Sequence, residues 1–107
     1  NAIVKVQRFI EENLDRELSR EALAEHVYLN QAYLSRLFHK ETGKSITDYI
    51  AELRVEKAKT GLAKTNEKIG EIAASVGYSN FSHFSQLFRK LTGFTPQDYR
   101  RKHQDVT

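Results

Sequence analysis

The sequence predicts an all-α domain in which two helix-turn-helix subdomains are joined by a long central helix. Three observations predict this class. Apolar residues recur at helical spacing through most of the chain. No segment alternates apolar and polar residues between turn residues, as a strand would. One segment is repeated, so that a single supersecondary unit occurs twice.

The repeat relates residues 33–49 (YLSRLFHKETGKSITDY) to residues 83–99 (HFSQLFRKLTGFTPQDY) at a constant offset of 50 positions. Eight pairs are identical: Ser35/Ser85, Leu37/Leu87, Phe38/Phe88, Lys40/Lys90, Thr42/Thr92, Gly43/Gly93, Asp48/Asp98 and Tyr49/Tyr99. Two copies are too few for a solenoid, which needs about three or more. We therefore expect two copies of one unit within one small domain.

A length of 107 residues predicts one domain with its own hydrophobic core. The chain has no cysteine, which excludes disulfides and thiolate metal sites and suits a reducing compartment. No apolar run approaches the roughly 20 residues of a membrane span, and no secretory signal is present. We expect a cytoplasmic protein with no membrane partner. The chain begins at Asn1 rather than Met, which indicates a piece of a longer protein.

The positive charge is concentrated toward the C-terminus. The net charge is +3, and it divides into −2 over residues 1–25, +2 over residues 26–75 and +3 over residues 76–107. Such asymmetry permits a surface that binds nucleic acid. A mildly basic chain is also common among proteins that bind none, so the charge by itself decides nothing.

The first helix-turn-helix is predicted over about residues 19–43, after an amphipathic helix at residues 2–14. Ser19 caps a short helix, and Asn30 caps a longer one that ends at Gly43. A short helix, a turn and a longer capped helix are typical of this motif. An ordinary αα-hairpin, which many helical bundles contain, is the alternative interpretation.

The linking helix is predicted over about residues 45–64, with Ser45 as its cap. Its apolar stripe is expected to comprise Ile46, Tyr49, Ile50, Leu53, Ala58 and Leu62. Val55 falls off this stripe, and Gly61 costs up to about 1 kcal/mol relative to Ala. A helix of roughly 20 residues spans about 30 Å, close to one turn of duplex DNA.

The second helix-turn-helix is predicted over about residues 68–93, with Asn80 as the cap of its longer helix. A C-terminal helix is predicted over about residues 95–103, where Thr95 is the cap and Pro96 the first helical residue. The tail after Gln104 is expected to fray.

Two of the three outward positions considered on the longer helices differ between the copies, whereas the buried face is repeated. Ala32, Ser35 and Arg36 in the first copy correspond to Ser82, Ser85 and Gln86 in the second. Divergence of DNA specificity on a shared scaffold would produce this pattern, and so would neutral drift of the surface.

Two other functional classes compete with DNA binding. An enzyme is not expected, because the sequence shows no phosphate loop, no nucleophile motif and no His spacing typical of metal ligands. We therefore expect no catalytic residues, no metal site and no cofactor. A helical protein-interaction module remains the third alternative.

Residues 69–100 (IGEIAASVGYSNFSHFSQLFRKLTGFTPQDYR) resemble the second helix-turn-helix of the AraC/XylS family of bacterial transcription regulators. They share its glycine spacing, FxxLF core, TG pair and TPxxYR end. Residues 18–45 resemble the first, and the ELRVEKAK stretch resembles the end of the linking helix. The resemblance implies a seven-helix, all-α domain that binds asymmetric DNA sites, often as a bent duplex, and mostly activates transcription. The departures from the family pattern are Tyr28, Gly61, His83 and Gln86.

By family position, the resemblance implies base contacts from Ala32, Ser35, Arg36, Phe81, Ser82 and Gln86. Arg36 can pair bidentately with guanine, and Gln86 with adenine. Phe81 offers apolar contact to a thymine methyl, or alternatively covers the turn against Tyr78. The candidates for phosphate contact are His39, Lys40, Lys44, Arg89, Lys90 and Arg100, each of which has a plain solvated charge as its alternative.

The partners expected from the resemblance are double-stranded DNA, RNA polymerase and an N-terminal domain elsewhere in the full-length protein. That domain is either a sugar sensor or a response-regulator receiver, and the segment is more similar to the response-regulator branch. The fragment itself is expected to be monomeric.

Overall fold

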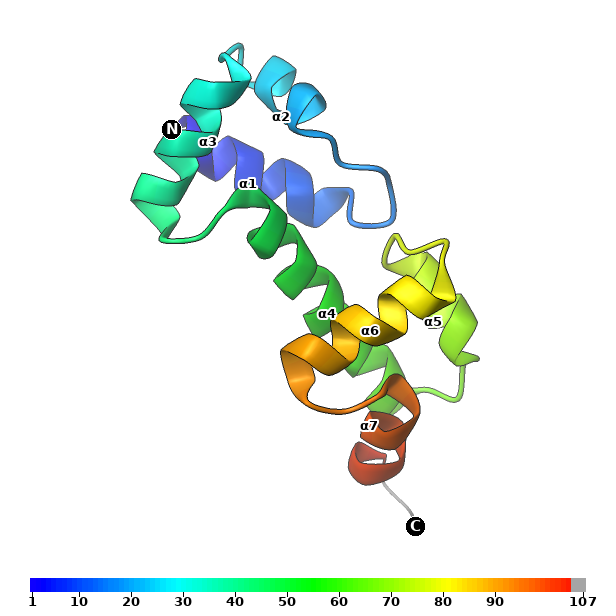
Figure 1. Ribbon diagram of the computed structural model, residues 1–107. Helices are drawn as coiled ribbons and strands as arrows, with labels where there is room; N and C mark the ends of the chain where they lie inside the picture. Colours follow the sequence, from blue (N-terminus) through cyan, green and yellow to red (C-terminus); the bar gives the residue numbers. More distant parts are fainter. Residues whose placement is uncertain (105–107) are drawn as a thin grey trace.

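The computed structural model describes residues 1–104, which form seven α-helices and no strand (Figure 1). The helices are α1 (Ala2–Glu12), α2 (Arg20–His26), α3 (Gln31–Thr42), α4 (Ile46–Lys64), α5 (Ile69–Ser75), α6 (Phe81–Thr92) and α7 (Pro96–His103). The predicted all-α class is confirmed. The predicted fraying after Gln104 concerns residues outside this range. None of the helices within it has the length and apolar composition needed to cross a membrane.

The helices begin where side-chain caps satisfy free backbone N–H groups. Five predicted caps accept such hydrogen bonds: Ser19, Asn30, Ser45, Asn80 and Thr95. The extent predicted for the first helix, residues 2–14, is wrong at its end, because α1 stops at Glu12. Leu14 is nevertheless buried. The spacing of apolar residues therefore predicted correctly that Leu14 is in the core, but not that it is helical.

The repeated Thr-Gly pair closes α3 and α6 with the same hydrogen bonds. The Thr42 hydroxyl donates to the Phe38 carbonyl at 2.8 Å, and the Thr92 hydroxyl donates to the Phe88 carbonyl at the same distance. Gly43 and Gly93 follow with φ of 78° and 85°, the left-handed conformation that glycine adopts without strain. The identity of the two segments is therefore explained by helix termination.

The repeated Phe and Tyr residues form the same packing contact in each copy. The Phe38 and Tyr49 rings lie edge to face at 5.2 Å, and the Phe88 and Tyr99 rings at 5.4 Å. Both phenylalanines are fully buried. Each copy is thus closed by the helix that follows its helix-turn-helix.

Helix α4 runs through both copies, with α1–α3 around its N-terminal part and α5–α7 around its C-terminal part (Figure 1). Ile46 and Ile50 belong to one hydrophobic core, formed with α1, α2 and α3. Val55, Ala58 and Leu62 belong to a second core, formed with α5 and α6. At about 100° per residue these two sets point to roughly opposite sides of the helix. The single stripe predicted for this helix is wrong, and Val55, which was placed off it, is buried.

We call α1–α3 with the N-terminal half of α4 the first unit, and the C-terminal half of α4 with α5–α7 the second unit. Helix α4 opens the second unit as α1 opens the first, since buried residues recur at the same spacing: Ile3, Val6 and Ile10 in α1, and Val55, Ala58 and Leu62 in α4. The duplication therefore extends beyond the segment that the sequence repeats visibly.

Candidate nucleic-acid interface

The outward face of α3 carries the residues predicted to contact DNA in the first unit. Ala32, Arg36, His39 and Lys40 are exposed, and Ser35 is half-buried. The opposite face of α3 buries Leu34 and Phe38 in the first core. Burial of one face fixes the rotation of the helix, so the polar set has to face solvent.

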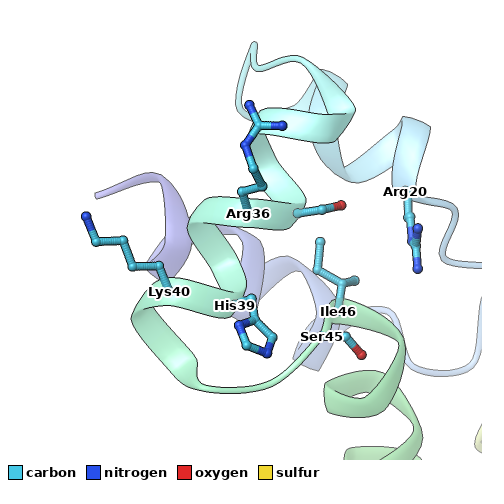
Figure 2. Close-up of a pocket in the computed structure, with 7 residues that line it drawn as sticks. Arg20, Arg36, His39, Lys40, Ser45 and Ile46 are labelled. Carbon is cyan, nitrogen blue, oxygen red and sulfur yellow. The ribbon is translucent and has the colours of Figure 1, made fainter.

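A hollow of about 390 Å³ lies beside this face (Figure 2). Its lining residues are Arg20, Ser35, Arg36, His39, Lys40, Ser45 and Ile46. Figure 2 shows Arg20 on α2 across the hollow from Arg36 on α3. Arg20, Arg36, Lys40 and His39 line this hollow, so the surface around it carries positive charge, although Figure 2 shows the charged ends of Arg36 and Lys40 pointing away from Arg20.

Arg20 was missed by the sequence reasoning. It is exposed, and its guanidinium donates to the Thr47 hydroxyl at 3.1 Å, which ties α2 to the first turn of α4. The only local signal was a cation placed directly after the Ser19 cap. The position of Arg20 beside α3 depends on the turn between α2 and α3, and the spacing of apolar residues does not predict the geometry of that turn.

A second hollow, of about 440 Å³, lies between the two units and is called the central hollow here. Its lining includes His39 from α3, Lys44 before α4, and Leu87, Lys90 and Leu91 from α6. The C-terminal parts of α3 and α6 thus face one another across the start of α4. Lys44 pairs with Glu52 at 2.9 Å, and both side chains remain about half exposed.

The second unit presents its predicted contact residues on α6. Phe81, Ser82, Gln86, Arg89 and Lys90 are all exposed. Phe81 leaves 50% of its surface in solvent, although its ring lies 6.4 Å from that of Phe84. The Tyr78 ring contacts the rings of His83 and Phe84 instead, each at 5.6 Å. Phe81 therefore stands at the start of α6 as an accessible aromatic group.

The Arg100 guanidinium is engaged within the protein, which argues against the phosphate contact predicted for it. Its Nε donates to the Leu62 carbonyl at 3.1 Å, and its Nη2 donates to the Thr65 carbonyl at 3.2 Å. The Gln104 amide also donates to Thr65, at 2.9 Å. These residues satisfy free carbonyls at the end of α4, as helix ends require. The geometry favours a structural role for Arg100, whose half-buried side chain ties α7 to the end of α4.

Within residues 1–104, no three His, Asp or Glu side chains are grouped so that they could hold a metal ion. The chemistry available on α3 and α6 is that of hydrogen-bond donors, cations and exposed aromatic rings such as Tyr33 and Phe81. Such groups recognise base edges and phosphates.

The family model described as a helix-turn-helix domain matches residues 23–102. The HTH-type transcriptional regulator YobQ of Bacillus subtilis is 40% identical over 92 residues, which cover 86% of this chain and 38% of that protein. The chain therefore spans less than half the length of that relative.

Two solved structures have the same fold. The C-terminal domain of AraT, a response regulator from Geobacillus stearothermophilus, is 32% identical with a TM-score of 0.95, over 98% of this chain and 88% of that one. The DNA-binding domain of the transcriptional factor AdpA, solved with a target DNA, is 24% identical with a TM-score of 0.91, over 95% and 92%. By its family match and its shared architecture, the chain belongs to the AraC-type helix-turn-helix family, as a DNA-binding domain of transcription regulators.

Proposed function

We propose that this domain reads double-stranded DNA sequence-specifically by placing α3 and α6 in two consecutive major-groove segments. One observation carries the proposal. The two helices share their caps, buried faces and Thr-Gly ends, yet they present different side chains outward. A duplicated scaffold with two different exposed faces is suited to reading two different half-sites.

The proposed base contacts are Ala32, Ser35, Arg36, Phe81, Ser82 and Gln86. Arg36 is exposed and carries the forked donors that match guanine N7 and O6. Gln86, its counterpart on α6, matches adenine N6 and N7. Phe81 supplies apolar contact to a thymine methyl, supported by its half-exposed ring.

The proposed phosphate contacts are His39, Lys40, Lys44, Arg89 and Lys90, with Arg20 added and Arg100 removed. Arg20 is added because it lines the hollow beside Arg36. Lys44 is kept although it pairs with Glu52, since an exposed ion pair contributes only about 0–1 kcal/mol and yields to a phosphate. The central hollow, between α3 and α6, is lined by Asp48 and Glu52 as well as by Lys44 and Lys90, so only its two lysines are proposed to face the DNA backbone between the two grooves.

The size of the domain fits two neighbouring grooves. Its longest dimension is 49 Å, whereas consecutive major-groove segments on one face of DNA lie about 34–36 Å apart. The AdpA domain, which has this fold, was solved with a target DNA.

The rest of the proposal concerns the whole protein. We propose a bacterial transcription regulator, an activator that contacts RNA polymerase in the cytoplasm and carries a sensor or receiver domain elsewhere in its chain. The similarity to the AraT domain, part of a response regulator, supports a receiver. The present domain is proposed to be monomeric.

The direct test is selection of bound duplexes from a random pool, followed by affinity measurements at fixed salt. Arg36→Ala is expected to weaken binding to the selected site by about 1–3 kcal/mol and to relax the base preference in one half of that site. Gln86→Ala is expected to relax preference in the other half. An unchanged affinity in Arg36→Ala would refute direct readout by α3.

Salt dependence tests the phosphate contacts separately. Lys90→Ala is expected to lower the slope of log K against log salt by about 0.9, since one phosphate contact is lost. Lys5→Ala, which removes an exposed charge from α1, is the matched control and should leave the slope unchanged.

A further inference from the structure

The two units have separate cores, so their relative orientation needs its own explanation. The main packing among the helices falls into two sets, one made by α1–α3 and the other by α5–α7, and α4 belongs to both. The two buried clusters meet at positions 50 and 55 of α4 without sharing a residue. A shared helix fixes the distance between the units, but the two separate cores do not by themselves fix how each unit is rotated about that helix.

Arg54 lies between these two clusters and contacts backbone from the first unit. Its Nε donates to the Leu14 carbonyl at 3.2 Å, and its Nη2 donates to the Arg16 carbonyl at 2.7 Å. Leu14 and Arg16 lie in the loop between α1 and α2. One half-buried guanidinium thus ties this loop to the middle of α4.

The same guanidinium contacts the turn of the second unit. Its Cζ lies 5.3 Å from the centroid of the Tyr78 ring, and Tyr78 is buried in the second core. Gly77 leaves so little room that a Cβ there would stand 2.9 Å from Arg54 Cζ and would also overlap the Leu14 carbonyl oxygen. The loop of the first unit, Arg54 and the turn of the second unit therefore form one packed junction, which we call the Arg54 junction.

We infer that Arg54 is a positioning residue that fixes the orientation of α3 relative to α6 before DNA binds. Only arginine supplies the two forked donors and the flat cation that this position uses; lysine offers a single point charge. A preset orientation converts binding of the second half-site into an intramolecular step with a high effective concentration. The inference rests on the proposed function for its consequence, but the junction itself is testable without DNA.

The first experiment measures orientation in the free 107-residue chain. The chain has no cysteine, so spin labels can be attached at Arg8→Cys on α1 and Glu71→Cys on α5, both exposed positions. Arg54→Met keeps the apolar stem and removes the donors. We expect the distribution of label distances to broaden or shift in Arg54→Met, while circular dichroism shows the helices intact.

Arg100→Met is the matched control. Arg100 also donates Nε and Nη2 to two carbonyls, but both acceptors, Leu62 and Thr65, lie within or beside the second unit's own helix α4. It should lower stability and leave the label distribution unchanged. An unchanged distribution in folded Arg54→Met, or equal broadening in Arg100→Met, would overturn the inference.

The second experiment measures affinity for the selected DNA site and for each half of it. We expect Arg54→Met to bind the complete site about tenfold more weakly and to bind either half-site almost as tightly as the unchanged chain. The reason is that the substitution affects only the docking of both units at once. Equal losses on all three DNAs would contradict a positioning role. Should Arg54→Met fail to fold, Arg54→Lys and Tyr78→Leu receive the same measurements. If selection yields no specific DNA, the proposed function fails, whereas the label distances still decide the junction.

Discussion

Gly77 packs directly on the carbonyl group of Leu14, and a Cβ at Gly77 would overlap that oxygen. Gly77 also has φ of 100°, so its position requires both the backbone conformation and the size of glycine. The equivalent turn of the first unit holds Tyr28, at φ of 58° and 94% exposed. The left-handed conformation therefore belongs to the turn itself, while the need for a small residue arises only where the units meet.

Gly77→Ala is expected to lower the free energy of unfolding by about 2–5 kcal/mol, from left-handed strain and from overlap with backbone. Gly43→Ala is the control, because Gly43 has φ of 78° but nothing within 4 Å of an added Cβ. Gly43→Ala should lower the free energy of unfolding by only about 1–2 kcal/mol. Urea unfolding measures both, and equal losses would show that the contact with Leu14 contributes nothing.

Tyr28→Gly is expected to stabilise the domain by about 0.5–1 kcal/mol. The substitution relieves left-handed strain, and this gain exceeds the entropy that glycine adds to the unfolded chain. Little packing is lost, since the Tyr28 side chain lies almost wholly in solvent. A lower melting temperature for Tyr28→Gly would show that the ring makes a stabilising contact after all.

Gly61→Ala is expected to stabilise α4 by about 0.5–1 kcal/mol, because alanine is the better helix former. An added Cβ would meet the Ile72 side chain of α5 at 3.4 Å, an ordinary contact. Gly61→Leu should instead destabilise by about 1–3 kcal/mol, since it forces α5 away. Chemical unfolding of the pair tests whether Ile72 sets the size limit at this departure from the family pattern.

Phe38→Ala and Phe88→Ala are each expected to cost about 3–5 kcal/mol, as both rings are fully buried. Because the two cores share no residue, each loss should act mainly on its own unit. Hydrogen exchange should show α1–α3 losing protection in Phe38→Ala and α5–α7 losing it in Phe88→Ala. Equal loss across both units in either variant would show that the units unfold as one.

Tyr78→Phe is expected to make the domain less sensitive to alkaline pH. Burial raises the pKa of Tyr78 above its ordinary value of 10.0, and Arg54 opposes this rise. The unfolded chain therefore releases the phenolic proton at lower pH than the folded chain, so this stabilising contribution is complete below about pH 10 and is lost as the pH rises through the folded pKa. Urea unfolding between about pH 9 and pH 11 should show a shallower decline in the variant. Parallel declines would contradict the assignment.

Most of the fold was predictable because its determinants are local. Caps such as Ser45 and Thr95 act on backbone within three residues, and the Thr-Gly ends act within five. Helical spacing marked the buried faces of α1, α3 and α6 for the same reason. The exception is α4, where a stripe on one face is followed by a stripe on the opposite face, so the two read as one and Val55 was misplaced.

The candidate site was predictable only as far as it follows from single helices. The outward positions of α3 and α6, including Arg36 and Gln86, follow from the burial of the opposite faces. Arg20 and Arg100 could not be assigned in this way, since their partners, Thr47 and Leu62, lie 27 and 38 residues away. A cation in sequence shows that a charge exists, but not whether phosphate or protein carbonyls receive it.

The sequence by itself determined the helices, most of their ends, the duplication and the family. Only the tertiary structure decided how the two copies are joined. Helix α4 uses roughly opposite faces for the two copies, and Arg54 lies between Leu14 and Tyr78. The physical reason is range. Periodicity and capping act over a few residues along the chain. The junction instead brings together backbone and side chains that are 23 to 40 residues from Arg54.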